Sequence, residues 1–577
     1  FLTGFFTCLF LYRSEWYHLG NLALALFLVI FVGVTQYHSR LKHRLHRLRL
    51  WRQIKETHLA RLRLDWSNIP SRAIITPEGH TYAGDLDITG THSLLGLMDV
   101  TFSIPGQTRL IDWLLAQNHR FLEKASWSER QQLVKELKTL TLLRDRMILE
   151  TQLLSSAPLS GDRIYSLLEK TVKFSHLKTV VIVATGLCLV TFSLFLGWGL
   201  WEIPGYWIIS FGCYVVLYFS TAGHLSPVFG RVLDLRRELE KLEALTRRLE
   251  RQSFRNFPTL QNLSLPLTTS PHRPSASLRQ LARLSHGLSV KAHPLVHLVL
   301  NAIVPWDMAL TLRLTRVCSW LRPTLPIWLD RIATIDAASS LATFAYLNPT
   351  YHWPNRETLP NGTPLPSLRA TNLGHPLIPA KRRITNDIDL RDRGQIVLVT
   401  GSNMSGKSTF LRTIGINVCL AQAGAPVCAE AFDWTWMRLF CCIRVTDSLE
   451  EGLSYFYAEV KRLKIILDAL HERTEPPVLF LIDEIYKGTN NRERLRGSES
   501  FIQALRQGNG LGLITTHDLE LAHLESDGKG VINMHFQETV EEGKLLFDYR
   551  LRPGPCPTTN ALRIMAQEGL PIPKKLL

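Results

Sequence analysis

Glycines, a lysine and hydroxyl side chains between Gly401 and Ser408 have the spacing that a polyphosphate site requires. The segment reads GSNMSGKS, which is G-x-x-x-x-G-K-S, and it follows an apolar run at 396–399 that predicts a buried parallel strand. Glycines let backbone N–H groups curl around phosphates, and a helix predicted from about 408 to 423 points its positive end at the anion. These residues predict a nucleotide site. The alternative is an ordinary glycine turn between a strand and a helix.

The polar side chains of this loop suggest how ATP and Mg²⁺ would be held. Lys407 supplies a mobile cation for the phosphates, and Ser408 supplies a hydroxyl oxygen for Mg²⁺. The predicted nucleotide-binding residues of the loop are Gly401, Asn403, Met404, Ser405, Gly406, Lys407, Ser408 and Thr409.

A second apolar strand, predicted at 478–482, ends in two carboxylates. Asp483 is placed to hold the Mg²⁺ shell, and Glu484 is placed to orient and deprotonate the attacking water as the catalytic base. Taken alone, such a pair is also compatible with a helix N-cap. Its occurrence after the glycine loop favours the Mg²⁺ interpretation.

A third strand, predicted at 511–515, ends in Thr516, His517 and Asp518. A histidine at the end of a strand that follows the carboxylate pair is placed to sense the terminal phosphate. We therefore include His517 among the predicted catalytic residues, with a loop or capping histidine as the alternative.

Long uncharged runs predict membrane helices. The chain has 577 residues, enough for several domains, and its apolar residues are concentrated in a few segments. Residues 19–37, 179–201 and 203–223 are each long enough to cross about 30 Å of hydrocarbon. Residues 1–12 resemble the end of a further span. The alternatives are a signal peptide for the N-terminal run and a buried core hairpin for the second pair.

Positive charge next to the apolar runs predicts their orientation. The net charge is +16, and the block at 40–52 carries six basic residues directly after the first of these runs. Because basic residues remain in the cytoplasm, we expect this block, the 231–251 segment and the nucleotide site there, with Glu15 and Glu202 outside. The competing interpretation of the block is a nucleic-acid contact. The nine cysteines lack metal-site spacing, which is typical of a reducing compartment.

Leucines recur at near-heptad spacing among Arg and Glu in 231–251, which predicts a long lever-like helix. Its basic residues Arg247, Arg248 and Arg251 are candidate phosphate contacts. If they hold a duplex, binding should weaken steeply with salt.

Several segments together resemble the MutS mismatch-repair family, a branch of the ABC-type ATPases. They are GSNMSGKSTFLRTIGINVCLAQAGAPVCA, DSLEEGLSYFYAEVKRL, LFLIDEIYKGTNNRER and LITTHDLEL, in this order. Weaker similarity begins near Asp85, in DLDITGTHSLLGLMDVTFSIPGQTRLIDWLL, and includes IDAASSLATFAYLNP. The resemblance is strong over 370–552.

The resemblance implies a homodimer whose ATP sites are shared between subunits. Gly452 and Ser454, in EGLSYFYAE, fall in the family's signature segment, which approaches the ATP of the partner subunit. A helix N-cap is the alternative for Ser454, and the two roles are compatible. The C-terminal TTNALRIMAQEGLP resembles the family's helical dimer contact.

The chain also departs from the family pattern. Only residues 53–84 lie between the basic block and the region that resembles the MutS core, too few for a separate mismatch-reading domain. Arg383 stands where an apolar neighbour of the adenine is expected. Mismatch recognition is therefore not expected.

The predicted fold is multidomain: an α-helical core and lever region with transmembrane helices, followed by a C-terminal α/β P-loop ATPase domain of the ABC type. The predicted divisions are a transmembrane hairpin at 1–38, a basic juxtamembrane linker at 39–84, helical core at 85–177, a second transmembrane hairpin at 178–223, core and lever at 224–366, the ATPase domain at 367–552 and a helical dimer contact at 553–577.

We expect a multi-pass membrane protein whose cytoplasmic ATPase uses ATP and Mg²⁺ to move a dimer and its levers, with DNA bound through phosphates, in mismatch repair or recombination. The alternative is an ABC-type ATPase coupled to membrane transport or assembly without DNA. Intact Lys407, Asp483 and Glu484 argue against a tether that does not hydrolyse ATP.

Overall fold

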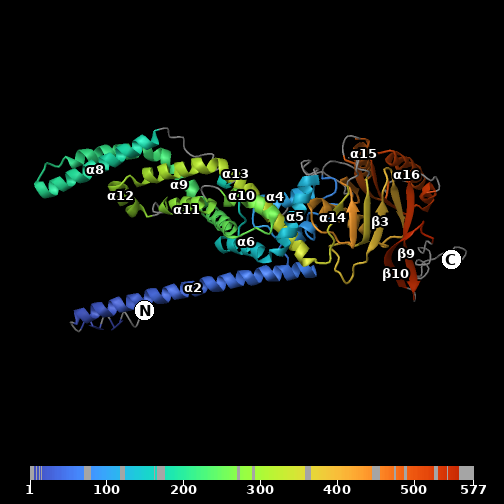
Figure 1. The fold of residues 1–577 in the computed structure, drawn as a ribbon, viewed down its shortest axis with the longest axis horizontal. Coiled ribbons are helices and arrows are strands. Elements are labelled where there is room, and N and C mark those ends of the chain that lie inside the picture. The colour runs from blue at the N-terminus through green and yellow to red at the C-terminus, as the bar shows by residue number, and fades with distance from the viewer. Residues whose placement is uncertain are drawn as a thin grey trace.

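An α/β domain and a long array of helices make up the protein, and Figure 1 shows them at opposite ends of an elongated molecule. The computed structural model describes residues 6–7, 10–11, 13, 16–70, 80–116, 124–161, 163–165, 176–269, 273–288, 293–357, 366–444, 455–472, 476–486, 490–525, 530–541 and 544–557. The helices that precede the α/β domain are α2 (Tyr17–Arg63), α3 (Leu94–Met98), α4 (Ile104–Leu114), α5 (Lys124–Thr139), α6 (Thr141–Leu154), α8 (Leu177–Trp201), α9 (Trp207–Arg251), α10 (Pro258–Thr268), α11 (Pro274–Leu288), α12 (Pro294–Ile303) and α13 (Trp306–Leu347).

The α/β domain contains two sheets. Its elements are β1 (Asn355–Arg356), β2 (Leu368–Leu373), β3 (Asn386–Leu390), β4 (Ile396–Thr400), α14 (Lys407–Ala423), β5 (Ala431–Trp434), β6 (Arg438–Cys442), α15 (Tyr455–His471), β7 (Val478–Asp483), α16 (Asn491–Arg506), β8 (Gly510–Thr516), the 3₁₀ helix η3 (Leu519–Glu525), β9 (Val531–Glu541) and β10 (Lys544–Pro553). The smaller sheet has the order β1-β5-β2-β3, and the larger one has the order β10-β9-β4-β8-β7-β6.

The larger sheet brings the predicted strands together. β4 pairs with β8, and β8 pairs with β7, all in parallel, while β10 pairs with β9 antiparallel. Thr400 is opposite Thr516, and Asp483 is opposite Thr515. Carboxyl ends of parallel strands meet at one edge, so the glycine loop, the carboxylate pair and His517 emerge side by side. All five residues of β4 are buried, as the uninterrupted apolar run predicts.

The helix α2 contains both the apolar run at 19–37 and the basic block at 40–52, without a break between them. The first part of the predicted basic linker at 39–84, through Arg63, is helical. No glycine or proline lies between Gly33 and Pro70, so nothing in the sequence stops the helix earlier. Similarly, α9 runs continuously from the second apolar pair into the lever segment, across the predicted division at 223.

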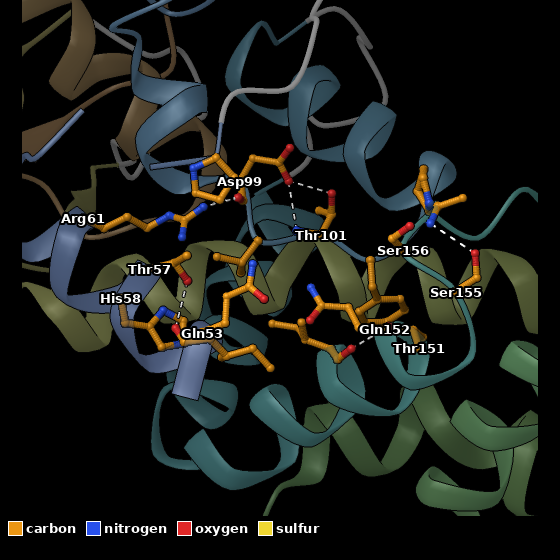
Figure 2. Close-up of a pocket in the computed structure, with 17 residues that line it drawn as sticks. Gln53, Thr57, His58, Arg61, Asp99, Thr101, Thr151, Gln152, Ser155 and Ser156 are labelled. Atoms are coloured by element: carbon orange, nitrogen blue, oxygen red, sulfur yellow. Dashed lines mark hydrogen bonds between the residues drawn. The ribbon is translucent and has the colours of Figure 1, made fainter. Parts of the chain in front are cut away.

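The C-terminal half of α2 is attached to the helical body around a buried carboxylate. Asp145 of α6 lies 3.0 Å from His58 Nε2 and also accepts a hydrogen bond from Lys55. Figure 2 shows the cavity beside this attachment, about 120 Å³ in volume, where Arg61 extends toward Asp99. The Arg61 guanidinium donates to the backbone oxygens of Leu97 and Asp99 at 3.0 and 2.7 Å. This cavity therefore belongs to the junction between α2 and the body.

Buried contacts also join the helical region to the α/β domain. The Asp85 carboxylate accepts from the Ile443 N–H at 2.9 Å and from Arg462 at 3.0 Å. Leu86 is fully buried against α14, where a Cβ on Gly415 would come within 2.6 Å of it. The segment at Asp85 and Leu86 therefore packs directly against α14 and α15 of the α/β domain.

Candidate functional site

The loop between β4 and α14 needs glycine at both ends. Gly401 has φ +147° and Gly406 has φ +106°, values that side chains other than glycine rarely adopt. A Cβ on Gly401 would lie 2.8 Å from the Phe536 oxygen, and one on Gly406 would lie 3.1 Å from the Tyr549 ring. The loop is therefore closely packed from behind, and its backbone N–H groups remain at the start of α14, where the helix dipole favours an anion.

Lys407 follows the loop as the first residue of α14 and is 6% exposed. Its ammonium donates to the backbone oxygens of Gly401 and Ser402 at 2.9 and 2.8 Å, and it is 3.4 Å from Nε2 of His517. A lysine turned toward loop carbonyls is a cation held at the place where phosphate oxygens would bind.

Ser408 and Asp483 meet as the sequence predicts for a Mg²⁺ site. The Ser408 hydroxyl donates to Asp483 Oδ2 at 2.8 Å, and the Thr515 hydroxyl donates to Oδ1 at 2.5 Å. The two oxygen ligands expected for Mg²⁺ are thus already in contact, with the carboxylate oriented by a third group. Thr515 was missed as a site residue in the sequence analysis, although it ends the third strand.

Glu484 and His517 form a pair beside this centre. Glu484 Oε1 lies 2.9 Å from His517 Nε2, and the Glu484 backbone N–H donates to the Thr515 oxygen at 3.1 Å. The φ of Glu484 is +64°, which is uncommon for a residue with a side chain. Backbone strain at this position is typical of a residue whose direction is fixed by function.

The remaining loop residues differ in exposure. Ser405 is buried, and its hydroxyl oxygen has no hydrogen-bond partner in the described part of the chain. Asn403 and Thr409 are exposed, and Met404 is 85% exposed with φ +68°. Ser402, which the sequence analysis did not select, donates a short hydrogen bond to Glu538 of β9.

A magnesium nucleotide fits these residues. The cradle is one that a Cβ would fill, the buried Ser405 hydroxyl needs an acceptor or donor, and oxygen ligands for a hard cation are present at Ser408 and Asp483. The arrangement can hold a polyphosphate against Lys407 with a carboxylate nearby to activate water.

The predicted signature residues Gly452 and Ser454 lie outside the described residues. The helix that follows them, α15, begins at Tyr455, and its buried Glu459 accepts from the Tyr486 N–H at 2.6 Å. Most of the predicted dimer contact at 553–577 also lies outside the described residues.

Arg383 and His375 at the entry to the domain have structural contacts. The Arg383 guanidinium donates to the Ile378 oxygen at 3.1 and 2.7 Å and lies 5.6 Å from the Tyr351 ring centre. Burial, with Arg412 nearby, lowers the pKa of His375 to about 4. Its Nδ1 therefore accepts the Leu377 N–H as a neutral imidazole, at 3.2 Å.

Comparison with known proteins agrees with the geometry of this domain. Residues 397–575 match the family model for MutS domain V. A DNA mismatch repair protein MutS 2 of Haloarcula marismortui is 31% identical over 257 residues, 42% of this chain and 27% of the relative. DNA mismatch repair protein MutS of Lactobacillus johnsonii is 31% identical over 259 residues, 43% of this chain and 29% of the relative. Endonuclease MutS2 of Thermomicrobium roseum is 29% identical over 245 residues, 41% of this chain and 30% of the relative.

The chain thus spans less than a third of the length of these relatives. The matched region contains the loop, the carboxylate pair and His517. The protein therefore combines a helical N-terminal region with a mixed α/β domain that is similar to domain V of the MutS family.

Proposed function

We propose that this chain is a membrane-anchored MutS-like ATPase that binds and hydrolyses ATP with Mg²⁺. The observation that supports this most strongly is the convergence of Lys407, Ser408, Asp483, Glu484 and His517 at one sheet edge. Ser408 and Asp483 would hold Mg²⁺, which when bound would supply Lewis-acid stabilisation of the phosphates. Glu484 orients and deprotonates the attacking water, and His517 lies between Glu484 and Lys407, close to both.

The proposed enzyme is a homodimer. Gly452 and Ser454 would approach the ATP of the partner subunit, as the resemblance to MutS implies. The exposed Met404 in the loop supports this arrangement, because a large exposed apolar side chain is stabilised when a second subunit covers it.

The apolar helices support attachment to a membrane. The helices His18–Arg63 and Leu177–Trp201 are long and apolar enough to cross a bilayer. In the most apolar 18-residue stretch of each helix, only 6% and 11% of the residues, respectively, are buried in the protein. Trp207–Thr221, the start of α9, is a shorter apolar helix. Figure 1 shows the N-terminal end of α2 and the hairpin of α8 and α9 extending to the end of the molecule far from the α/β domain. One bilayer would cover them there and leave the ATPase in the cytoplasm.

Cysteine labelling tests this topology. In the α8–α9 connection, Glu202 has a left-handed conformation and is exposed. In sealed vesicles, a Glu202→Cys protein should react with a membrane-impermeant reagent only when the reagent is on the side of the membrane opposite the cytoplasm. The unsubstituted chain, whose Cys213 is also exposed, is the matched control. Reaction of position 202 from the cytoplasmic side alone would contradict the proposed topology.

We propose that the ATPase binds DNA through its phosphates. The names of the relatives suggest a role related to mismatch repair or recombination. The net charge of +16 supports it. Of the predicted contacts, Arg247 lies 3.6 Å from Glu243 and Arg248 lies 3.6 Å from Glu150, whereas Arg251 is exposed. Arg251 is therefore the best placed of the three. Weak, salt-sensitive binding without mismatch preference is expected.

The deciding experiment measures ATP turnover of the detergent-solubilised chain alone and with matched, mismatched, branched or single-stranded DNA. DNA should alter turnover, and a single mismatch should add little. Titrations at two salt concentrations check that phosphates carry the binding. If no nucleic acid binds with ATP or ADP, the ATPase serves membrane transport or assembly instead.

A further inference from the structure

Two antiparallel helices, α11 and α13, enclose a groove of about 470 Å³ beside the proposed membrane region. From this groove we propose, on the basis of the membrane attachment above, that the protein holds an anionic phospholipid with its phosphate on arginines. The lining residues are Gln280, Arg283, Leu284, Gly287, Trp306, Leu310, Arg313, Arg316 and Val317.

Within the part of the chain that the structure describes, the arginines of the groove have no carboxylate partner. Arg283, Arg313 and Arg316 are exposed, and no ion pair joins them to any residue that the structure describes. By contrast, the neighbouring Arg279 is held at 2.8 Å by Glu243. Uncompensated guanidiniums around one hollow raise the local concentration of anions, and their planar donors match phosphate oxygens.

The groove changes character along its length. Gly287 and Trp306 lie at one end, where the indole N–H donates to the Gly287 oxygen at 3.3 Å, and Leu310 packs against Gly287. On α13, Arg313 and Arg316 follow toward the other end, and on α11, Arg283 precedes Gly287. The groove therefore offers apolar and aromatic surface at one end and positive charge at the other, which matches the two parts of a phospholipid.

The apolar end faces the proposed bilayer. The short helix α12 immediately precedes Trp306 and is bent by 86° from α13. Its exposed side chains are apolar, with Leu295 81% and Leu298 69% exposed. It is attached to α9 through a hydrogen bond from the Tyr214 hydroxyl to the Asn301 oxygen, inside the apolar segment Trp207–Thr221. Figure 1 shows α12 on the same side of the helical body as α8.

This geometry orients the lipid. Acyl chains would lie against α12 and Trp306, and the headgroup would reach Arg283, Arg313 and Arg316. Figure 1 shows α13 extending from α12 toward the α/β domain, so the headgroup would lie on the side of that domain. Basic pockets at the cytoplasmic side of membrane helices hold anionic headgroups for the same electrostatic reason. A DNA phosphate would satisfy the arginines but leave the apolar end exposed, so the groove favours a lipid.

Lipid binding to the full chain in detergent tests the proposal. Native mass spectrometry should show tighter retention of phosphatidylglycerol than of phosphatidylcholine with the same acyl chains. Arg313→Gln and Arg316→Gln should each reduce phosphatidylglycerol affinity by about fivefold, the value expected for one basic contact of about 1 kcal/mol. Arg322→Gln, which removes an exposed arginine of α13 outside the groove, is the matched control and should change little.

Competition experiments separate the possible sources of phosphate. Neither inorganic phosphate nor a short DNA duplex should displace phosphatidylglycerol. Displacement by the duplex, equal retention of the two lipids, or equal losses in Arg313→Gln and Arg322→Gln would overturn the proposal. A chain that stays soluble without detergent would instead refute the membrane attachment, whereas a detergent-dependent chain without lipid preference would refute this inference alone.

Discussion

Replacing Glu484 with glutamine should leave ATP binding intact and nearly abolish turnover. Glutamine has the same length and keeps an oxygen for the contact with His517, now 2.9 Å away. The substitution leaves the Lys407 contacts to the loop carbonyls and the Ser408–Asp483 hydrogen bond unaltered, so the phosphate and Mg²⁺ ligands should stay in place. Only the base is lost. A general base contributes about 10²–10⁴-fold to a rate, so the barrier should rise by about 3–5 kcal/mol.

Steady-state phosphate release and nucleotide titration measure the two effects separately. Glu499→Gln is the matched control, because Glu499 also lies beside a histidine, His523, at 3.6 Å, but on the surface formed by α16 and η3. It should retain normal turnover. If Glu484→Gln turns over at the normal rate, or if it loses ATP binding as well, Glu484 is not the base.

Three further predictions concern nucleotide binding and stability. Lys407→Ala should weaken ATP binding by about 10–100-fold in a nucleotide titration, because one charged hydrogen-bond donor to phosphate is lost; unchanged affinity would contradict the loop assignment. Asp145→Ala should destabilise the protein by about 2 kcal/mol, measured by thermal unfolding, because it leaves Lys55 and His58 without their buried acceptor; an unchanged midpoint would show that α2 is held elsewhere. Burial depresses the pKa of His375 to about 4, below its value in the unfolded chain. The free energy of unfolding should therefore fall as pH falls from the unfolded toward the folded pKa, by roughly 2 kcal/mol between pH 7 and pH 5. His375→Asn should remove this pH dependence.

The arrangement of the candidate nucleotide site was predictable from sequence because its parts are local. β4, the loop and the start of α14 are continuous in the sequence. The apolar strand, the glycines and Lys407 therefore form one pattern that can be recognised without the structure. Asp483 and Glu484 directly follow an apolar strand, and parallel pairing then requires that they lie beside the loop. His517 follows from the same rule.

Contacts between distant segments were not predictable. Thr515 orients Asp483, and Ser402 binds Glu538, but neither hydroxyl differs in sequence from an ordinary strand or loop residue. The Asp85–Arg462 contact joins residues 377 positions apart, and nothing local indicates it.

The helices show a similar limit. The apolar run and basic block in α2 were recognised separately because composition changes between them, although no residue breaks the helix. The apolar helix α12 was not predicted, since its ten residues are too short to span a bilayer and its exposure appears only in three dimensions.

The most direct test of the account is the ATP hydrolysis rate of the full chain extracted with detergent from the membrane fraction, with Mg²⁺ and with Mg²⁺ chelated. We predict turnover in that fraction that requires Mg²⁺ and disappears in Lys407→Ala. Turnover that persists in Lys407→Ala, or a membrane-extracted chain that hydrolyses no ATP with Mg²⁺ present, would contradict it.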